Sequence, residues 1–257
     1  MGDNLKTKVA VIGLGWVGKS MVELFPDAVV YDEPLNLGNK EDVNKCDVAF
    51  ICVPTPNKFN KALDTSIVED VVSWCKAELL VIRSTVNPGT TDELYYKYKK
   101  HIVMQPEYLG ETVNHPMLDP TTRQFIIIGG HRVNTRKLVE LYTQAYNANT
   151  MIRQVTALEA EVIKLSENRA IAFKVAQAQE LFDACESAGV DYYTVREAVY
   201  GDDPRFNRWF TFIYPGKRGF KSKCIPKDVY AWAVWAEDCM LTDALLEYNE
   251  RLLNGNS

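Results

Sequence analysis

Short apolar segments alternate with segments of helical periodicity over residues 8–147. Apolar runs rich in β-branched residues predict strands, and the amphipathic runs between them predict helices. The expected strands are 8–12, 28–31, 47–53, 79–84, 101–104 and 125–129, and the expected helices lie near 66–77, 90–99 and 133–147. This alternation is typical of a doubly wound parallel sheet.

Strand character ends near residue 155. The run 156–188 contains no Pro or Gly and has apolar residues at helical spacing, so we expect one long helix there. A shorter helix is expected at 191–200, then a loop that contains Gly and Pro, and a single last helix from Pro226 to about Leu253. The pattern predicts an α/β protein with the sheet in residues 1–152 and an all-helical domain with one long central helix in residues 153–257.

The first expected strand ends directly on a glycine motif. Residues 13–18 read Gly-Leu-Gly-Trp-Val-Gly, and G-x-G-x-x-G between a strand and a helix indicates a dinucleotide-binding turn. Gly13 permits the turn, Gly15 lets a pyrophosphate approach the backbone, and Gly18 lets the helix pack against the strand. Asp32 follows the second strand at the spacing of a carboxylate that binds the adenine ribose, which favours NAD over NADP. The sheet is therefore predicted to be a Rossmann-type domain.

The same glycines, followed by Lys19 and Ser20, also satisfy the P-loop pattern of nucleotide triphosphatases. A P-loop protein needs an acidic residue at the end of an apolar strand to hold Mg²⁺. Here one strand runs into Pro54 and the next into Arg83. With Asp32 in place, the dinucleotide interpretation is favoured, and Lys19 and Ser20 are expected to be ordinary helix residues.

Polar loops follow three of the expected strands, at 54–56, 84–90 and 105–108. Ligands of doubly wound sheets bind beyond the carboxyl ends of the strands, although Pro, Gly, Ser and Thr are also common turn residues. Farther along, Lys164 and Asn168 share one face of the long helix and could reach one ligand atom, although such a pair more often faces solvent.

A cysteine precedes the last expected helix. Pro226 suits the first helical position, which places Cys224 at the helix N-terminus between Lys223 and Lys227. Unpaired backbone N–H groups and nearby cations favour the nucleophilic thiolate. The other interpretation is a buried cysteine that acts as a small apolar side chain. The local sequence leaves both open.

Composition narrows the class of protein. The 257 residues include 47% hydrophobic and 25% charged residues, which is enough for a sizeable core. The net charge of -5 gives no excess of basic residues that would favour binding to nucleic acid or to an anionic membrane. No apolar run is long enough to span a bilayer, and the N-terminus lacks a secretory signal, so a cytoplasmic location is expected. The six cysteines are scattered and no histidine has metal-ligand spacing, so we expect neither a structural disulfide nor a metal site.

Taken in order, the motifs resemble those of the UDP-glucose/GDP-mannose dehydrogenase family of NAD-dependent nucleotide-sugar dehydrogenases. The resemblance covers nearly the whole chain, and although each motif alone is weak, the set is specific. The motifs are G-L-G-W-V-G at 13–18, V-P-T-P at 53–56, S-T-V-N-P-G-T at 84–90, P-E-Y-L at 106–109, I-G-G at 128–130, E-x-x-K-x-x-x-N at 161–168, D-P-R at 203–205 and C-x-P-K-D at 224–228.

The resemblance implies two successive oxidations of a sugar primary alcohol by NAD⁺, through a thioester on Cys224. Lys164 and Asn168 would then stabilise an oxyanion, Asp228 would position or activate water, and Glu107 with Thr85 would manage the proton and water of hydrolysis. The residues implied to contact NAD are Gly13, Gly15, Trp16, Val17, Gly18, Asp32, Pro54, Thr55 and Thr85. A nucleotide sugar is the implied substrate, and the family relation together with the length of the central helix implies a homodimer.

Two departures from the family pattern bear on the substrate. Lys221 and Ser222 stand where family members usually have two glycines before the cysteine, so their side chains could narrow the sugar pocket. Family chains also continue into a second α/β domain that supplies much of the nucleotide pocket, and this chain ends at Ser257, about where that domain would begin. Two alternatives therefore stay open: a dehydrogenase that oxidises a smaller hydroxy acid once, or a non-catalytic NAD-binding module that docks to a partner.

Overall fold

The computed structural model describes residues 7–110, 117, 119–122, 124–214 and 216–255. The chain divides into two compact units, Met1–Lys58 with Leu63–Lys164 and Phe59–Ala62 with Leu165–Ser257. The boundary predicted at residue 152 falls within a strand of the first unit, whereas the units divide after Lys164 on the long helix. Each unit has its own core.

The first unit contains the predicted doubly wound sheet. Its seven strands are ordered β2-β1-β3-β4-β5-β6-β7, and neighbouring strands are parallel except β5 and β6. Because β2 lies on one side of β1 and β3 on the other, the sheet has a topological switch point at the end of β1. The strands are β1 (Val9–Ile12), β2 (Val29–Tyr31), β3 (Val48–Ile51), β4 (Leu79–Ile82), β5 (Ile102–Met104), β6 (Phe125–Gly130) and β7 (Met151–Val155).

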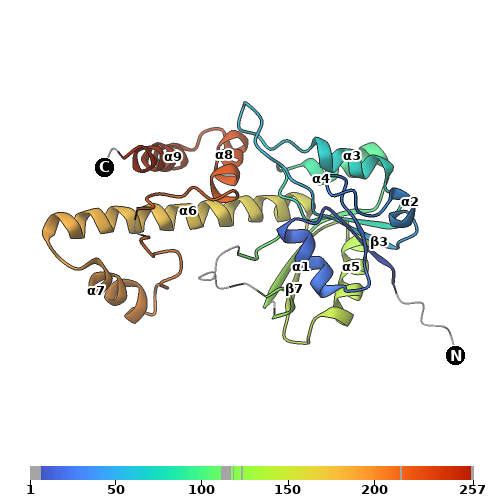
Figure 1. Cartoon of the computed structure of the whole chain (residues 1–257), viewed down its shortest axis with the longest axis horizontal. Coiled ribbons are helices and arrows are strands. Elements are labelled where there is room, and N and C mark those ends of the chain that lie inside the picture. Colours follow the sequence, from blue (N-terminus) through green and yellow to red (C-terminus); the bar gives the residue numbers. More distant parts are fainter. Residues whose placement is uncertain (1–6, 111–116, 118, 123, 215, 256–257) are drawn as a thin grey trace. The chain divides into compact units, whose positions relative to one another are not determined.

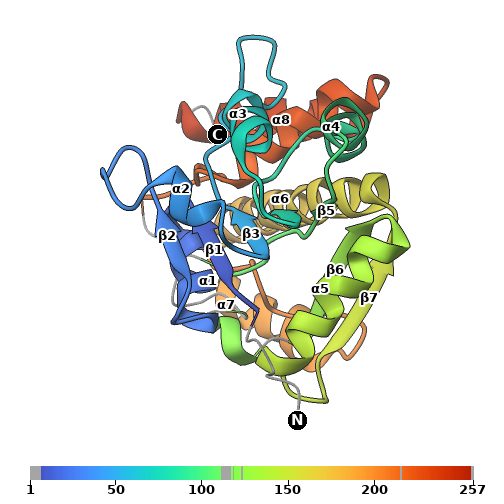
Figure 2. The ribbon, with the colours of Figure 1, turned by 90° about the vertical axis from the view of Figure 1, so that its right-hand side faces the viewer.

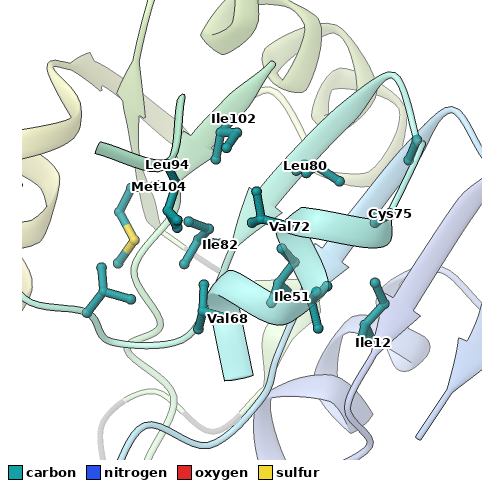
Figure 3. Packing of buried hydrophobic residues seen from close by; sticks show 14 of the residues in the cluster. Ile12, Ile51, Val68, Val72, Cys75, Leu80, Ile82, Leu94, Ile102 and Met104 are labelled. Carbon is teal, nitrogen blue, oxygen red and sulfur yellow. The ribbon is translucent and has the colours of Figure 1, made fainter. Parts of the chain in front are cut away.

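Helices cover both faces of this sheet (Figures 1 and 2). They are α1 (Trp16–Leu24), α2 (Lys40–Val43), α3 (Ser66–Trp74), α4 (Thr90–Tyr98) and α5 (Arg132–Ala145), with a short 3-10 turn at Pro120–Thr122. Figure 3 shows the core on the α3 and α4 face, where Val68 and Val72 of α3 pack against Ile51 and Ile82. Alternate strand residues face α1 and α5 instead. Burial on both faces explains why the central strands appear in the sequence as continuous apolar runs.

The second unit is helical, as predicted. Its main element is α6 (Ala157–Ala188), a helix of 32 residues that begins in the first unit. It is the long yellow to orange helix in Figure 1. The expected helix at 191–200 is present as α7 (Tyr192–Arg196), followed by a π-helical turn at Glu197–Asp202. Cys185 of α6, Tyr192 and Ile213 form a small core at this end of the unit.

The single last helix predicted from Pro226 to about Leu253 is wrong. The structure has two helices there, α8 (Ile225–Ala236) and α9 (Met240–Leu253), separated by a break in which Glu237 adopts a φ of 55°. Val229 of α8 and Leu246 of α9 both pack with Ala172 of α6 in one core. One straight helix could not bring both segments against the same stretch of α6, so packing overrides the local preference for a continuous helix.

Candidate functional site

The glycine turn of the first unit is built by close backbone packing. Gly13 has a φ of 89°, and its N–H donates to the carbonyl of Tyr31 at 2.8 Å. A Cβ atom on Gly13 would lie 2.7 Å from the carbonyl oxygen of Cys52, and one on Gly18 would lie 1.9 Å from that of Gly13. At Gly15, by contrast, no atom lies within 4 Å of the Cβ position. Two of the glycines therefore serve packing, and Gly15 leaves open space.

That open space lies at the N-terminus of α1. No side chain caps this helix, and its first turn contains no acidic residue, so its N–H groups fit a pyrophosphate. Trp16 is exposed and Val17 is partly buried at its start. The hydroxyl of Ser20 donates to the carbonyl of Val17 at 2.7 Å, and Lys19 is exposed. Lys19 and Ser20 thus take the ordinary helical positions expected of them under the dinucleotide interpretation.

Asp32 lies beside the glycine turn. One carboxylate oxygen accepts a hydrogen bond from the N–H of Leu14 at 2.7 Å, and the other accepts one from the N–H of Leu35 at 3.0 Å. The carboxylate therefore sits at the end of β2, next to the switch point, where an acidic residue of this fold binds ribose hydroxyls. The described residues at this turn fit an adenine dinucleotide.

The loops after β3 and β4 are linked to each other. The hydroxyl of Thr55 donates to the carbonyl of Thr85 at 2.7 Å, and that of Ser84 donates to the carbonyl of Val53 at 2.6 Å. Pro54 is exposed, and Thr85 is partly buried. The structure thus brings two of the three predicted polar loops together at the carboxyl ends of neighbouring strands.

Glu107, in the third polar loop, is engaged on both carboxylate oxygens. One oxygen is paired with the guanidinium of Arg83. The other accepts hydrogen bonds from the N–H groups of Tyr108 and Leu109 at 2.6 and 2.8 Å. Although burial disfavours the charged guanidinium, the carboxylate of Glu107 raises the pKa of Arg83 overall. In the sequence, Arg83 was noted only as the residue that ends an apolar strand. A charged residue directly after a buried strand was the one sign that it could pair with a buried carboxylate.

Glu161 and Lys164 lie on the part of α6 that belongs to the first unit. The Glu161 carboxylate accepts hydrogen bonds from the Gly89 N–H at 2.6 Å and from the N–H and hydroxyl of Thr91 at 2.8 and 2.6 Å. Burial raises the pKa of Glu161, and these donors oppose that rise. Glu161 therefore fastens α6 to the N-terminus of α4. One turn later, the ammonium of Lys164 lies 5.3 Å from the ring centre of Tyr108.

The remaining predicted residues lie in the second unit. The Asn168 amide donates to one oxygen of Asp228 at 2.5 Å, and the Lys227 ammonium donates to the other at 2.7 Å. Asp228 is completely buried in the first turn of α8. Its N–H donates to the carbonyl of Cys224 at 3.0 Å, so the two residues are one helical turn apart. Asn168 of α6 thus meets the turn of α8 that begins at Cys224.

Cys224 is exposed at the start of α8, whereas four of the other cysteines are buried and Cys239 is intermediate. The interpretation of Cys224 as a buried packing residue is therefore wrong. The loop before it is held by the side chain of Asn249. The Asn249 amide oxygen accepts a hydrogen bond from the Phe220 N–H at 2.7 Å, and its NH₂ group donates to the Phe220 carbonyl at 3.1 Å. The hydroxyl of Ser222 accepts a hydrogen bond from the Ile225 N–H at 3.1 Å. One of the side chains that departs from the family pattern thus binds the first N–H group of α8.

The predicted site residues therefore form two groups, one in each unit. No cluster of three or more His, Cys, Asp or Glu side chains suited to a metal ion occurs among the residues that the structure describes. In the same part of the chain, no helix is both long enough and apolar enough to cross a bilayer.

Comparison with known proteins identifies the family. Residues 27–146 match the NAD binding domain of the UDP-glucose/GDP-mannose dehydrogenase family, and residues 158–252 match its central domain. The chain belongs to this family, and NAD is the cofactor of the matched domain.

Similar proteins carry related names. The chain is 29% identical to a UDP-glucose 6-dehydrogenase of Rickettsia typhi, over 84% of this chain and 51% of that protein. It is 28% identical to a GDP-mannose 6-dehydrogenase of Azotobacter vinelandii, over 81% and 52%. The structure of a UDP-glucose dehydrogenase from Pyrobaculum islandicum matches with a TM-score of 0.80 at 25% identity, over 99% of this chain and 70% of that one. The chain spans about half the length of the two sequence relatives.

Proposed function

We propose that this protein oxidises the primary alcohol of a nucleotide sugar to a uronic acid, with NAD⁺ as oxidant and Cys224 as a covalent nucleophile. The observation that carries the proposal is the placement of Cys224. Its thiol is exposed at the start of α8, one turn from the buried Asp228, and Asp228 is bound by Asn168 of α6. A thiol one helical turn from a carboxylate that an amide binds is suited to acyl chemistry.

The proposed reaction has two oxidations and one hydrolysis. NAD⁺ supplies the hydride acceptor, one molecule for each oxidation. The first oxidation converts the alcohol to an aldehyde, and the thiolate of Cys224 adds to the aldehyde carbon to give a thiohemiacetal. The second hydride loss leaves a thioester, and water then replaces the sulfur to give the carboxylate and free thiolate. Both electron pairs leave as hydride, the alcohol proton and the two protons of water are released to solvent, and water supplies the second carboxylate oxygen.

The polar side chains receive separate roles. Lys164 and Asn168, one turn apart on α6, stabilise the oxyanions that form at the aldehyde and in hydrolysis. Asp228 orients the Asn168 amide and positions the attacking water. Thr85 lies in the loop after β4, where its carbonyl accepts a hydrogen bond from the Thr55 hydroxyl, and it is proposed to contact NAD. The expectation that Glu107 moves a proton stays a prediction, and its bonds to Arg83 and two N–H groups favour a positioning role.

The proposed substrate class is a nucleotide sugar, and Lys221 and Ser222 are proposed to set its fit. Both side chains are exposed in the loop that leads to Cys224. The basic side chain of Lys221 favours an anionic substrate beside the thiol. The relatives' names include both UDP-glucose and GDP-mannose as substrates of those proteins.

We further propose that the protein forms a cytoplasmic homodimer through α6. A hollow of about 430 Å³ lies along this helix, between Phe173 and Lys174 on one side and Tyr200 and Phe206 on the other. An apolar and cationic hollow on a helix of 32 residues is a surface that a second copy could cover. Sedimentation at micromolar concentration is expected to give a dimer, and a monomer alone would contradict the proposal.

Substitution of Cys224 tests the covalent step. UDP-glucose, GDP-mannose and acetamido sugar nucleotides are incubated with NAD⁺, and NADH and product mass are measured. Cys224→Ala is expected to lose acid formation almost completely. Cys224→Ser is expected to stall after the aldehyde or to retain an ester, because an alkoxide leaves far less readily than a thiolate, and intact-protein mass spectrometry detects the ester.

The matched control is Cys239→Ala, because Cys239 is also the N-cap residue of a helix in the second unit. This variant is expected to keep full activity and wild-type NAD affinity. Normal acid production by Cys224→Ala would refute the covalent mechanism and favour a dehydrogenase that acts once. NAD binding without turnover of any sugar nucleotide or hydroxy acid would favour a non-catalytic module.

A further inference from the structure

Arg83 is a buried cation that the proposed reaction does not use. It follows β4 directly, and its side chain is only 1% exposed. One terminal nitrogen donates to the carbonyl oxygens of Gln105 and Pro106 at 2.9 and 3.1 Å. The other donates to the carboxylate of Glu107. The guanidinium therefore binds three consecutive residues of the segment that follows β5.

This fork fixes the backbone of residues 105–109. Glu107 lies between Arg83 on one side and the N–H groups of Tyr108 and Leu109 on the other. The planar guanidinium presents two terminal nitrogens in a fixed geometry, and a lysine ammonium would not match all three acceptors in the same arrangement. The conformation of the loop therefore depends on the shape of the Arg83 side chain as well as its charge.

The segment held by Arg83 leads to Lys164. Tyr108 is buried, and the Lys164 ammonium lies over its ring. A ring face attracts a cation within about 6 Å, so the place of the Tyr108 ring helps to set the place of the ammonium. Contacts within the first unit thus run from Arg83 through Glu107 to Tyr108 and Lys164.

The titratable groups around this pair favour an ionised Glu107. Cys52 is buried nearby at the end of β3, and burial raises its pKa to about 12, so its thiol is neutral at ordinary pH. Tyr142 of α5 and Tyr146, the residue after this helix, lie near Arg83, and the Tyr142 hydroxyl donates to the Gln105 side chain. With a neutral thiol on this side, the Arg83 cation and two N–H donors stabilise the carboxylate.

We propose that Arg83 is a positioning residue that keeps Glu107 ionised and fixes residues 105–109, so that Tyr108 holds the Lys164 ammonium in place. The effect on turnover rests on the proposed dehydrogenase function. The ionisation of Glu107 is a property of the protein without substrate and does not depend on that function.

The ionisation is measured on protein labelled with ¹³C at glutamate carboxyl carbons. The Glu107 signal is identified by its loss in Glu107→Gln. In the wild type this signal is expected to keep its carboxylate position between about pH 5 and 9, since the Arg83 cation and two N–H donors bind the carboxylate. In Arg83→Met the buried carboxylate loses its cation, so its pKa should rise and the signal should titrate within the window. A wild-type signal that titrates there, or one that Arg83→Met leaves unmoved, would overturn the proposal.

Arg83→Lys separates shape from charge. It is expected to keep Glu107 ionised but to lower kcat by roughly tenfold or more, because small displacements of a catalytic group are costly, while the KM for NAD changes less than twofold. The double variant Arg83→Met with Glu107→Gln removes both charges, so it should fold even if Arg83→Met alone does not. Its rate should lack the pH dependence that Arg83→Met introduces.

Two outcomes distinguish the hypotheses. If Arg83→Lys keeps the wild-type kcat while Glu107 stays ionised, the positioning role is refuted and the proposed function is untouched. If the wild-type protein oxidises no nucleotide sugar, the proposed function fails, and the carboxyl signal still confirms or refutes the role of Arg83.

Discussion

Two alanine substitutions in the glycine motif are expected to have opposite effects. Gly18→Ala would place a Cβ atom 1.9 Å from the Gly13 carbonyl oxygen, well inside the 3.0 Å that real Cβ contacts respect. The obstacle is backbone, so α1 or the turn must move. Such overpacking costs about 3 kcal/mol or more. At roughly 2–4 °C per kcal/mol, the melting temperature should fall by at least about 6 °C.

Gly15→Ala should leave stability nearly unchanged. Gly15 has a φ of -72°, which alanine adopts without strain, and no atom lies within 4 Å of its Cβ position. The added methyl group enters the space proposed for the pyrophosphate. We expect NAD affinity to fall by about tenfold or more, equivalent to at least about 1.4 kcal/mol.

Differential scanning fluorimetry and calorimetric titration with NAD⁺ measure the two effects separately. Gly18→Ala should lower the melting temperature strongly, and Gly15→Ala should weaken NAD binding at a melting temperature within about 2 °C of wild type. Wild-type NAD affinity in Gly15→Ala would show that the pyrophosphate does not approach Gly15. A stable Gly18→Ala would refute the packing argument.

Three further substitutions test other contacts. Glu161→Gln replaces an acceptor oxygen by a donor at the start of α4 and should lower the free energy of unfolding by about 2–3 kcal/mol in a urea titration. The control Glu159→Gln, at an exposed position on α6, should change this free energy by less than about 0.5 kcal/mol. Equal effects would show that Glu161 does not fasten α6 to α4. Asp32→Ala should weaken NAD binding by about tenfold and reduce discrimination against NADP in parallel titrations, and Glu33→Ala should do neither. Ser222→Ala removes the acceptor of the Ile225 N–H and should lower the free energy of unfolding by about 1 kcal/mol in a urea titration, whereas Ser222→Thr keeps a hydroxyl acceptor and should lower it by less than about 0.5 kcal/mol. Equal losses would contradict the role of the hydroxyl.

The sheet could be predicted because its central strands are buried on both faces. Strands such as β1, β3 and β4 consist only of apolar, buried residues, and they stand out from the polar turns around them. The short α2 has one turn of mostly polar residues, and β7 is only partly buried, so neither has a strong periodic pattern. The break between α8 and α9 contains no Gly or Pro, and it reflects packing against α6 that no local signal records.

The site residues could be predicted by type but not by partner. The turn at residues 13–18 and Asp32 follow from spacing, because strand, turn and helix are local in sequence. Glu107 and its cation are 24 residues apart, and Glu161 binds groups 70 and 72 residues earlier. Only the folded sheet brings such groups together, so the sequence could not reveal which carboxylates are already bound.

This difference separates two kinds of residue within one motif. In the segment 161–168, Glu161 is buried on the N-terminus of α4 and its task is to hold α6, whereas Asn168 reaches the first turn of α8 at Asp228. The presence of Glu161 is therefore explained by folding alone and does not argue for catalysis. Cys224 is different, because an exposed thiol adds little to a core. Among the motif residues, it is Cys224 whose placement folding explains least, so the proposed chemistry depends most directly on its substitution.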